Sequence, residues 1–411
     1  MKKLFDKYKT VKKQLAYDHK GYPIENIVSL ELISLIYKRE NFNIRRSLVY
    51  FFAVRKIKIP TQKKALFSIG DYNRKDYYEL LKHVMTSYQN ESDLVDLSNS
   101  KRSLTFSLSN IFSAFKIVFF RKLELNFLSK ITLAASITHN LNNIDFLEKQ
   151  TPTNIKLFCA FCSNLNEEAV LNYFFKKNNI PTYSLQHGLW FIYDTPPIDA
   201  IAYENVVADK LLCWGEYTRD EFIKYGMDER RLVVAGYPKK TTPLILPKKS
   251  HKKLRVLVLL ARSQFDENNL NLISLLSQST LNIEFEFKLH PALLVEKYSD
   301  QLKFESFNFA PTGTVQELLN LNRYDCSISY NSTAYYDSYI NNCICLRYRD
   351  ADADNAISVL DDSFTSVSEF ESKINLVLTA QTDEKVWTEI EKNLTYILGY
   401  RINNYESFSK I

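Results

Sequence analysis

Between about residues 155 and 350, short apolar runs alternate with amphipathic segments, and this alternation limits the fold more than any other feature. Eight apolar runs are predicted strands: 155–161, 181–185, 211–214, 232–235, 254–261, 283–289, 326–329 and 343–346. Helical segments separate most of them, for example 216–225 and 268–279. Strands that alternate with helices favour parallel sheets covered by helices. The sequence therefore predicts an α/β protein with two parallel-sheet domains.

The flanking segments complete the predicted domain organisation. Residues 1–60 are expected to be a helical, basic N-terminal segment. The first domain is placed at 61–240, with a strand at 65–69, a helix from Lys75, a polar surface loop at 90–105 and helices over 106–150. A proline-containing linker at 239–253 leads to a second domain at 254–383. A C-terminal helix is predicted at 384–411.

Glycine is scarce, with 8 residues in 411. Neither a GxGxxG dinucleotide fingerprint nor a GxxxxGK[ST] phosphate loop is present, so phosphate binding would need other groups. Four glycines fall in one window: Gly188, Gly215, Gly226 and Gly236. Glycine is favoured where the backbone turns tightly or approaches a ligand. The window is therefore a candidate site, or a set of ordinary loops.

The formal net charge is +6, and many basic residues lie in the first 64 positions. No nucleic-acid-binding motif accompanies them, so we expect no nucleic-acid partner. The stretch 112–130 mixes phenylalanines with Lys and Arg, which suits an anionic membrane surface or, alternatively, a core helix with a solvated basic face. The start, Met1-Lys2-Lys3, does not resemble a signal peptide. A cytoplasmic location is expected. Peripheral binding at the inner face of the plasma membrane is compatible with this expectation.

Neither cysteines nor acidic residues form a convincing metal motif. The six cysteines lie mostly in apolar runs, and Cys159 and Cys162 have no second pair, so buried thiols are expected. The segment 350–355 imitates half of a calcium loop, but Asn355 replaces the turn glycine. We expect a solvated acidic loop there, no metal and no cofactor.

Two histidines follow predicted strands about a hundred residues apart. His187 lies in Gln186-His187-Gly188, where Gly188 lets the chain turn and exposes the imidazole. A histidine near its ordinary pKa of about 6.5 can take a proton from a hydroxyl nucleophile. The alternative is a structural histidine at a strand end. Because ligands bind outside the carboxyl ends of parallel strands, His187 is a candidate catalytic base in a cleft between two sheets.

The second histidine, His290, precedes Pro291, which fixes the following turn and extends the backbone. Lys288 lies two residues earlier, on the same face of the strand. Donors here could bind a phosphate and stabilise the charge of a leaving nucleotide. Arg262, which follows the 254–261 strand, is a further candidate for the phosphates. A surface His-Pro turn is the simpler interpretation.

A third candidate segment, 329–333, joins a strand to a helix and is rich in hydroxyl groups. Ser329, Asn331, Ser332 and Thr333 are candidate donor-binding residues. Backbone N–H groups at a helix start, together with the hydroxyls, can form an anion site without glycine. The same residue types also make an ordinary helix cap. Its position at the carboxyl end of a strand, in the same domain as His290, favours the binding role.

Together these motifs resemble glycosyltransferases of the GT-B architecture that build bacterial surface polymers. The likeness covers about residues 155–350 and is nearest to the branch containing CDP-glycerol glycerophosphotransferases, polysialyltransferases and capsule Kdo transferases. Gln186-His187-Gly188 is similar to the His-Gly site whose histidine is the proposed base, and the turn at Gly236 is similar to the Gly-Tyr-Pro turn that follows. Lys288-Leu289-His290-Pro291 is similar to the His-Pro motif that contacts donor phosphate, and Ser332-Thr333 to the Ser/Thr pair.

The resemblance implies a two-domain fold of Rossmann-like sheets and an inverting, metal-independent transfer of sugar from a nucleotide-sugar to a hydroxyl of a polysaccharide or lipid-linked acceptor. Gln186 stands where the polyol-phosphate transferases often have Trp, and Ser329 where an Asp is expected, which favours a sugar donor over CDP-glycerol. Three alternatives remain: a polyol-phosphate transferase, a sugar-nucleotide epimerase-like enzyme, and a non-enzymatic scaffold of a polysaccharide assembly complex.

Overall fold

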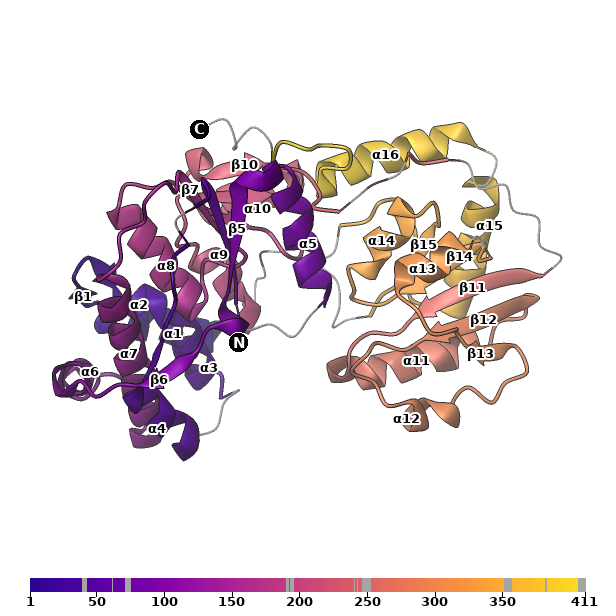
Figure 1. Cartoon of the computed structure of the whole chain (residues 1–411). Coiled ribbons are helices and arrows are strands. Elements are labelled where there is room, and N and C mark those ends of the chain that lie inside the picture. The colour runs from indigo at the N-terminus through magenta and orange to yellow at the C-terminus, as the bar shows by residue number, and fades with distance from the viewer. Residues whose placement is uncertain are drawn as a thin grey trace. The chain divides into compact units, whose positions relative to one another are not determined.

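The computed structural model divides the chain into two compact units (Figure 1). Unit 1 comprises Met1–Lys239 and Ile402–Ile411, and unit 2 comprises Lys240–Arg401. The structure describes residues 1–38, 43–60, 62–70, 75–189, 192, 196–239, 241, 243–245, 253–321, 323–350, 357–380 and 383–405. Some predicted features lie outside these ranges: most of the 70–74 loop and of the 239–253 linker, and the acidic segment after Asp350. The two units are described separately.

Unit 1 contains a six-stranded sheet in which every neighbouring pair of strands is parallel. Its spatial order is β10 (Leu232–Val234), β9 (Lys210–Cys213), β8 (Thr182–Leu185), β7 (Leu157–Ala160), β4 (Ala65–Ile69) and β5 (Ser92–Asp96). The four central strands are almost entirely buried, which explains their continuous apolar sequences. This is one of the two doubly wound sheets predicted from the sequence.

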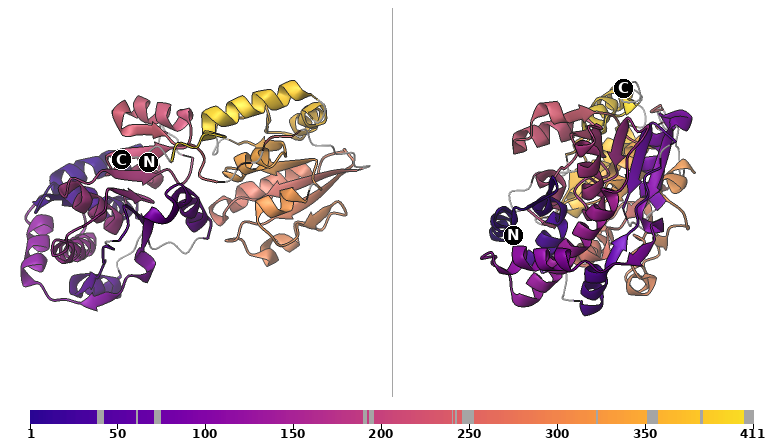
Figure 2. Two further views of the ribbon diagram at one scale, coloured as in Figure 1. Left: turned by 45° about the horizontal axis from the view of Figure 1, so that its top comes forward. Right: turned by 60° about the vertical axis from the view of Figure 1, so that its left-hand side comes forward.

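Separate cores cover the two faces of this sheet. On one face, Phe158 and Leu211 pack with residues of α1 (Lys2–Leu15), α2 (Ile24–Ile27), α3 (Ser29–Ile36), α6 (Leu108–Phe119), α7 (Phe127–Leu147) and α8 (Asn166–Lys177). On the other face, Phe67 and Leu185 pack with α5 (Lys75–Thr86) and Tyr405. Figure 1 shows α5 on the opposite side of the strands from α7 and α8, and Figure 2 shows the magenta helices stacked beside the strands.

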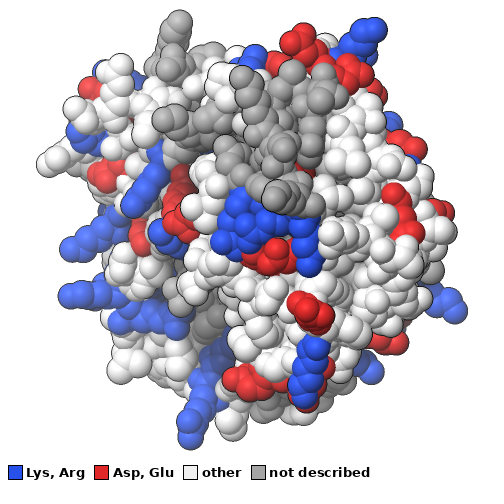
Figure 3. All heavy atoms as spheres, turned by 90° about the vertical axis from the view of Figure 1, so that its right-hand side faces the viewer, with Lys and Arg blue, Asp and Glu red and all other residues white. Residues whose placement is uncertain are grey.

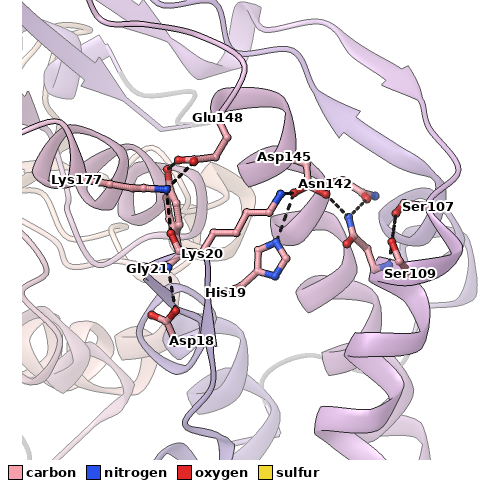
Figure 4. A network of polar contacts seen from close by, with 12 residues as sticks. Asp18, His19, Lys20, Gly21, Ser107, Ser109, Asn142, Asp145, Glu148 and Lys177 are labelled. Atoms are coloured by element: carbon pink, nitrogen blue, oxygen red, sulfur yellow. Dashed lines mark hydrogen bonds and ion pairs between the residues drawn. The ribbon is translucent and has the colours of Figure 1, made fainter.

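The basic N-terminal segment is part of this first core. Tyr8, Leu15 and Tyr22 are buried among side chains of α7 and α8. Figure 4 shows the polar contacts that reinforce this packing: Asp145 accepts hydrogen bonds from Lys20 and from Asn110, and Glu148 accepts from Tyr22 and Lys177. Residues 1–38 therefore fold with unit 1 instead of extending from it.

The prediction of a loop at 90–105 is wrong. This segment contains β5, at the edge of the sheet, and β6 (Arg102–Leu104), which pairs antiparallel with β3 (Ala53–Arg55). β5 reads Ser-Asp-Leu-Val-Asp, and most of its side chains are only half buried. An edge strand tolerates this polar composition, which hides it from a search for apolar runs.

Unit 2 contains a second six-stranded parallel sheet. Its spatial order is β13 (Phe307–Phe309), β12 (Ile283–Lys288), β11 (Leu254–Leu259), β14 (Cys326–Ser329), β15 (Cys345–Tyr348) and β16 (Ser363–Phe364). Its helices are α11 (Asp266–Leu276), α12 (Val295–Ser299), α13 (Val315–Asn320), α14 (Ala334–Ile340), α15 (Val367–Ala380) and α16 (Glu384–Leu398). The sequence predicted the four central strands but not β13, β16 or α15.

Ion pairs close the amino-terminal edge of this second sheet. The buried carboxylate of Glu286 accepts hydrogen bonds from Arg255 at 2.6 Å, from Arg323, and from the hydroxyl of Tyr324 at 2.6 Å. Figure 3 looks onto the right-hand side of Figure 1, where β11 and β12 begin, and shows basic and acidic side chains next to one another. Paired charges occupy this edge, whereas the predicted site residues lie at or after the carboxyl ends of strands.

The last described residues return to unit 1. α16 ends at Leu398, and Asn404 donates from its backbone to the carbonyl of Ala235 at 2.9 Å. The hydroxyl of Tyr405 donates to the carbonyl of Gly236 at 2.7 Å. Gly236 has a φ of +104°, and a Cβ there would lie 1.8 Å from the carbonyl oxygen of Ile402. Gly236 is therefore needed for the close approach of this returning segment.

Candidate functional site

Both sheets have the strand orders in which open α/β proteins bind ligands. In unit 2 the chain adds strands on one side of β11, first β12 and then β13. It then adds β14, β15 and β16 on the other side, so the direction reverses between β11 and β14. In unit 1 the reversal lies between β4 and β7. Ligands bind outside the carboxyl ends of strands at such a switch point. Each unit therefore has one topologically defined candidate half-site.

His187 lies beside the switch point of unit 1. It follows β8, whose neighbour is β7, and its side chain is partly buried, with Nδ1 on the buried side. The ring centroid is 5.1 Å from that of Phe161, just after β7, and 5.8 Å from that of Tyr77 on α5, which follows β4. Phe161 and Tyr77 also contact each other at 4.9 Å. Aromatic groups from both sides of the switch point thus hold the imidazole.

Gln186 fixes the backbone that carries His187. Its side-chain nitrogen donates to the carbonyl of Gly188 at 2.8 Å and to the hydroxyl of Thr218, on α10 (Glu216–Tyr225), at 3.0 Å. Its side-chain oxygen accepts from the backbone of Trp214 at 2.6 Å, and its main-chain carbonyl accepts from the indole of Trp214 at 2.7 Å. This buried amide ties the end of β8 to the end of β9 and to α10.

A buried carboxyl group supports the same edge of the sheet. Glu168, in the first turn of α8, accepts hydrogen bonds from Ser68 of β4 at 2.7 Å and from the backbone of Phe161 at 2.9 Å. Burial, and the neighbouring carboxylate of Glu167, raise the pKa of Glu168 to about 8 against the opposing effect of these hydrogen bonds. Glu168 therefore holds in place the residue whose ring packs against His187.

In unit 2, Lys288 and His290 occupy the end of β12. The ammonium group of Lys288 donates to the carbonyl of Gly313, and burial lowers the pKa of this lysine. His290 is exposed, and its Nδ1 accepts from the backbone of Ala292 at 3.1 Å. A neutral histidine that accepts at Nδ1 carries its proton on Nε2. His290 thereby has the tautomer of a hydrogen-bond donor, with Pro291 fixing the turn that sets it.

Arg262 follows β11 at the switch point of unit 2. It is exposed, and its guanidinium lies 5.9 Å from the ring centroid of Phe265. Phe265 meets the ring of Tyr330, just after β14, edge to face at 5.7 Å. The hydroxyl of Tyr330 donates to Asp350, which also accepts from Asn268 at 2.6 Å. These contacts join the ends of β11 and β14 into one polar and aromatic cluster.

The segment after β14 carries the predicted polar residues, and they differ in exposure. Asn331 is exposed with a φ of +40°, a conformation that asparagine tolerates better than most residues. The hydroxyl of Ser332 accepts from the backbone of Ala334 at 3.2 Å, and Thr333 is exposed at the start of α14. Ser329 is fully buried and pairs in register with Leu259 of β11, so it belongs to the core of the sheet, unlike the exposed Asn331 and Thr333. The register also sets Lys288 opposite Leu259.

The described residues include no group of three or more His, Cys, Asp or Glu side chains placed to hold a metal. All six cysteines are buried free thiols, as predicted. Within the described ranges, no helix combines the length and apolar character needed to cross a membrane.

Sequence reasoning did not identify Tyr77, Phe161, Phe265, Asp350 or Asn268 as parts of the half-sites. Each acts through a contact with a residue distant in the sequence, such as the hydrogen bond between Asn268 and Asp350. Asp350 was assigned only to a solvated acidic loop. Only their position in the chain could have indicated them: apart from Asp350, each of these residues follows a strand that borders a switch point.

Comparison with solved structures identifies the fold. The chain is similar to the lipopolysaccharide outer core galactosyltransferase WaaB, with a TM-score of 0.51 and 13% identity over 85% of this chain and 100% of that one. HepE of Anabaena, solved with UDP-glucose, has a TM-score of 0.47 and 12% identity over 85% and 98% of the two chains. UDP-GlcNAc 2-epimerase of Methanocaldococcus jannaschii has a TM-score of 0.47 and 12% identity over 82% and 100%.

No protein-family model matches the sequence, and no curated protein matches it significantly. At 13% identity, the likeness to WaaB shows the fold and nothing finer. The chain thus has an α/β, GT-B-like fold with two parallel-sheet domains, as predicted from the sequence, and each sheet has six strands. The likeness favours no particular branch of these proteins.

Proposed function

We propose that the protein is a glycosyltransferase that moves a sugar from a nucleotide-sugar to a hydroxyl group of a cell-surface polysaccharide or lipid-linked acceptor. The observation that carries the proposal is the placement of one histidine at the carboxyl edge of each sheet. His187 follows β8 and His290 follows β12, and each of these strands is the neighbour of a strand at the switch point. The GT-B-like fold supports it, because its solved relatives include a galactosyltransferase.

The donor nucleotide is assigned to unit 2. The Nε2–H of His290 and the guanidinium of Arg262 would donate to the phosphates, with the hydroxyls of Ser332 and Thr333 as further donors. Lys288 contributes by holding the Gly313 loop beside them. When the bond between the sugar and the phosphate breaks, negative charge grows on the leaving nucleotide, and these donors stabilise it.

The acceptor is assigned to unit 1. His187 would take the proton of the acceptor hydroxyl while the oxygen attacks the anomeric carbon. A single displacement of this kind inverts the configuration at that carbon. The rings of Phe161 and Tyr77 would orient the imidazole, and the Gln186 network would fix its backbone.

Nucleotide release from UDP-, CMP- and CDP-linked donors, measured with polysaccharide and lipid-linked acceptor fractions, tests the assignment. His187→Ala should lower release by about 10²–10⁴-fold, the usual contribution of a general base, while nucleotide still raises the melting temperature. His290→Ala should instead weaken nucleotide binding, by about tenfold for one lost charge-assisted hydrogen bond.

His83→Ala is the matched control, because His83 lies on α5 but outside the half-site, and it should change neither quantity. If His187→Ala kept most of its turnover, the assignment of the base would be wrong. Release from CDP-glycerol alone would indicate a polyol-phosphate transferase, and conversion of the donor without an acceptor would indicate an epimerase. If no nucleotide stabilised the protein, a scaffold role would replace the enzyme.

A further inference from the structure

Exposed apolar side chains gather on one part of unit 1, on α4 (Ile44–Phe52), β6, α6 and the start of α7, which lie near one another in Figure 1. We call this group the aromatic surface. Its members are Ile44, Leu48, Val49, Leu104, Phe106, Leu108, Phe112, Phe120, Phe127 and Leu128, all of them exposed. Apolar residues scattered singly over a surface are ordinary, but a contiguous group of this size needs an explanation.

Helix α6 and the residue after it carry the most prominent part. Leu108, Phe112 and Phe120 are 67%, 68% and 82% exposed. They are spaced by multiples of four residues, so they fall along one side of the helix, and Lys116 occupies the remaining position of the row. The opposite side, with Ala114, Ile117 and Val118, is buried in the core. The helix is therefore apolar on both sides, and among the described residues only the buried side packs against other elements.

Ring contacts make the aromatic surface continuous across elements. Exposed Phe106 stacks on Phe52 at 5.8 Å, and exposed Phe127 meets Phe119 edge to face at 5.8 Å. Between them, Phe51 stacks on Phe115 at 5.6 Å and Phe115 stacks on Phe119 at 5.4 Å. Half-buried phenylalanines thus support the exposed rings of Phe106 and Phe127 from below.

Positive charge surrounds these apolar groups. Residues 43–60 and 101–130 hold eleven Lys and Arg residues and one acidic residue, Glu124, in a chain whose total net charge is +6. Some of the basic groups pair inside the protein, as Arg46 does with Glu31. The exposed ones are Arg45, Lys56, Lys58, Lys101, Arg102, Lys116 and Lys122. Exposed aromatic side chains among basic ones are typical of proteins that bind at the interface of an anionic membrane.

We propose that the aromatic surface docks unit 1 on an anionic lipid bilayer, with Phe112 and Phe120 in the interfacial region and Lys116 and Lys122 against the headgroups. Charge decides against a second copy as the occupant, because two such surfaces face to face would bring like charges together. The proposal goes beyond glycosyl transfer and does not rest on it, since it depends only on the exposure and charge of these residues.

Co-sedimentation of the full chain with lipid vesicles tests the proposal. The protein should bind vesicles of equal parts phosphatidylcholine and phosphatidylglycerol, bind pure phosphatidylcholine much more weakly, and lose affinity as salt rises. Phe112→Ser and Phe120→Ser should each lower the affinity for the anionic vesicles by about tenfold, the effect of withdrawing one aromatic side chain from the interface. Lys116→Gln and Lys122→Gln should each lower it by about fivefold.

Leu294→Ser is the matched control, because Leu294 is 70% exposed but lies in unit 2, and it should leave vesicle binding unchanged. Circular dichroism of each variant establishes that it is folded. The proposal is overturned if the wild type does not bind anionic vesicles, or if the phenylalanine variants bind as well as the wild type. It is equally overturned if the wild type forms a dimer that Phe112→Ser dissociates, since the surface would then belong to a second copy.

Discussion

Gln186 fixes the backbone that carries His187. Its amide makes hydrogen bonds to Gly188, Thr218 and Trp214, which belong to three separate parts of unit 1. The sequence placed His187 after a strand because the preceding run is apolar and Gly188 follows. It gave no sign of the amide network, because the partners of Gln186 include residues about thirty positions away. The sequence therefore predicted the position of His187 after a strand, while the structure shows which side chains support it.

The carboxyl group of Glu168 should make the stability of unit 1 depend on pH. Burial raises its pKa from about 4.5 to about 8, so the folded state holds a proton that the unfolded state has released. Its contribution is therefore most favourable below about pH 4.5 and declines, by up to about 1.4 kcal/mol per pH unit, as pH rises toward 8. The Glu168→Gln variant lacks this titrating group. The stability of the variant relative to the wild type should therefore rise between about pH 5 and about pH 8.

Urea unfolding of both proteins across this range measures the difference. Glu79→Gln, at an exposed position of α5, is the control and should run parallel to the wild type. Parallel curves for Glu168→Gln as well would mean that the carboxyl group is not held protonated in the folded protein.

At the scale of elements, an apolar sequence decided which strands could be predicted, including β10 at a sheet edge. β4, β7, β8, β11 and β14 lie inside their sheets and read as apolar runs. β5, β13 and β16 lie at sheet edges and are short or polar, so no apolar run marks them. Strand order could not be predicted either, since it depends on pairing between distant segments. The switch points, and with them the two half-sites, became visible only in the structure.

The returning C-terminal segment should depend on Gly236. Gly236→Ala would set a Cβ against the backbone of Ile402, whereas Gly226→Ala, at a similar φ of +101°, has open space around it. The Gly226 variant should lose about 1–2 kcal/mol of stability from the left-handed conformation alone. The Gly236 variant should lose more, because the segment that carries Tyr405 must also move.

Chemical denaturation of the two variants under the same conditions separates the cost of the left-handed backbone conformation from the cost of the clash with Ile402. Faster proteolysis within the C-terminal segment of the Gly236 variant would locate the damage. Equal losses of stability in the two variants would show that the segment does not pack closely on Gly236.

At the scale of the whole molecule, two half-sites of different character belong to one chain. Unit 1 offers a single histidine framed by aromatic rings, as suits a base acting on a hydroxyl. Unit 2 offers several donors at the end of its strands, among them His290 and Arg262, as suits phosphates. The sequence predicted both histidines and the GT-B-like fold from short motifs in a fixed order. The contacts around the two histidines could not be predicted from those motifs, because they join residues distant in the sequence, such as Tyr330 and Asp350.

The most direct measurement is a crystal structure of the protein soaked with UDP, CMP and CDP in turn. We expect electron density for one of these nucleotides at the carboxyl ends of β12, β11 and β14, with its phosphates against Nε2 of His290 and the guanidinium of Arg262. Density elsewhere on the chain, or no bound nucleotide at saturating concentration, would contradict the assignment of unit 2 as the donor-binding unit.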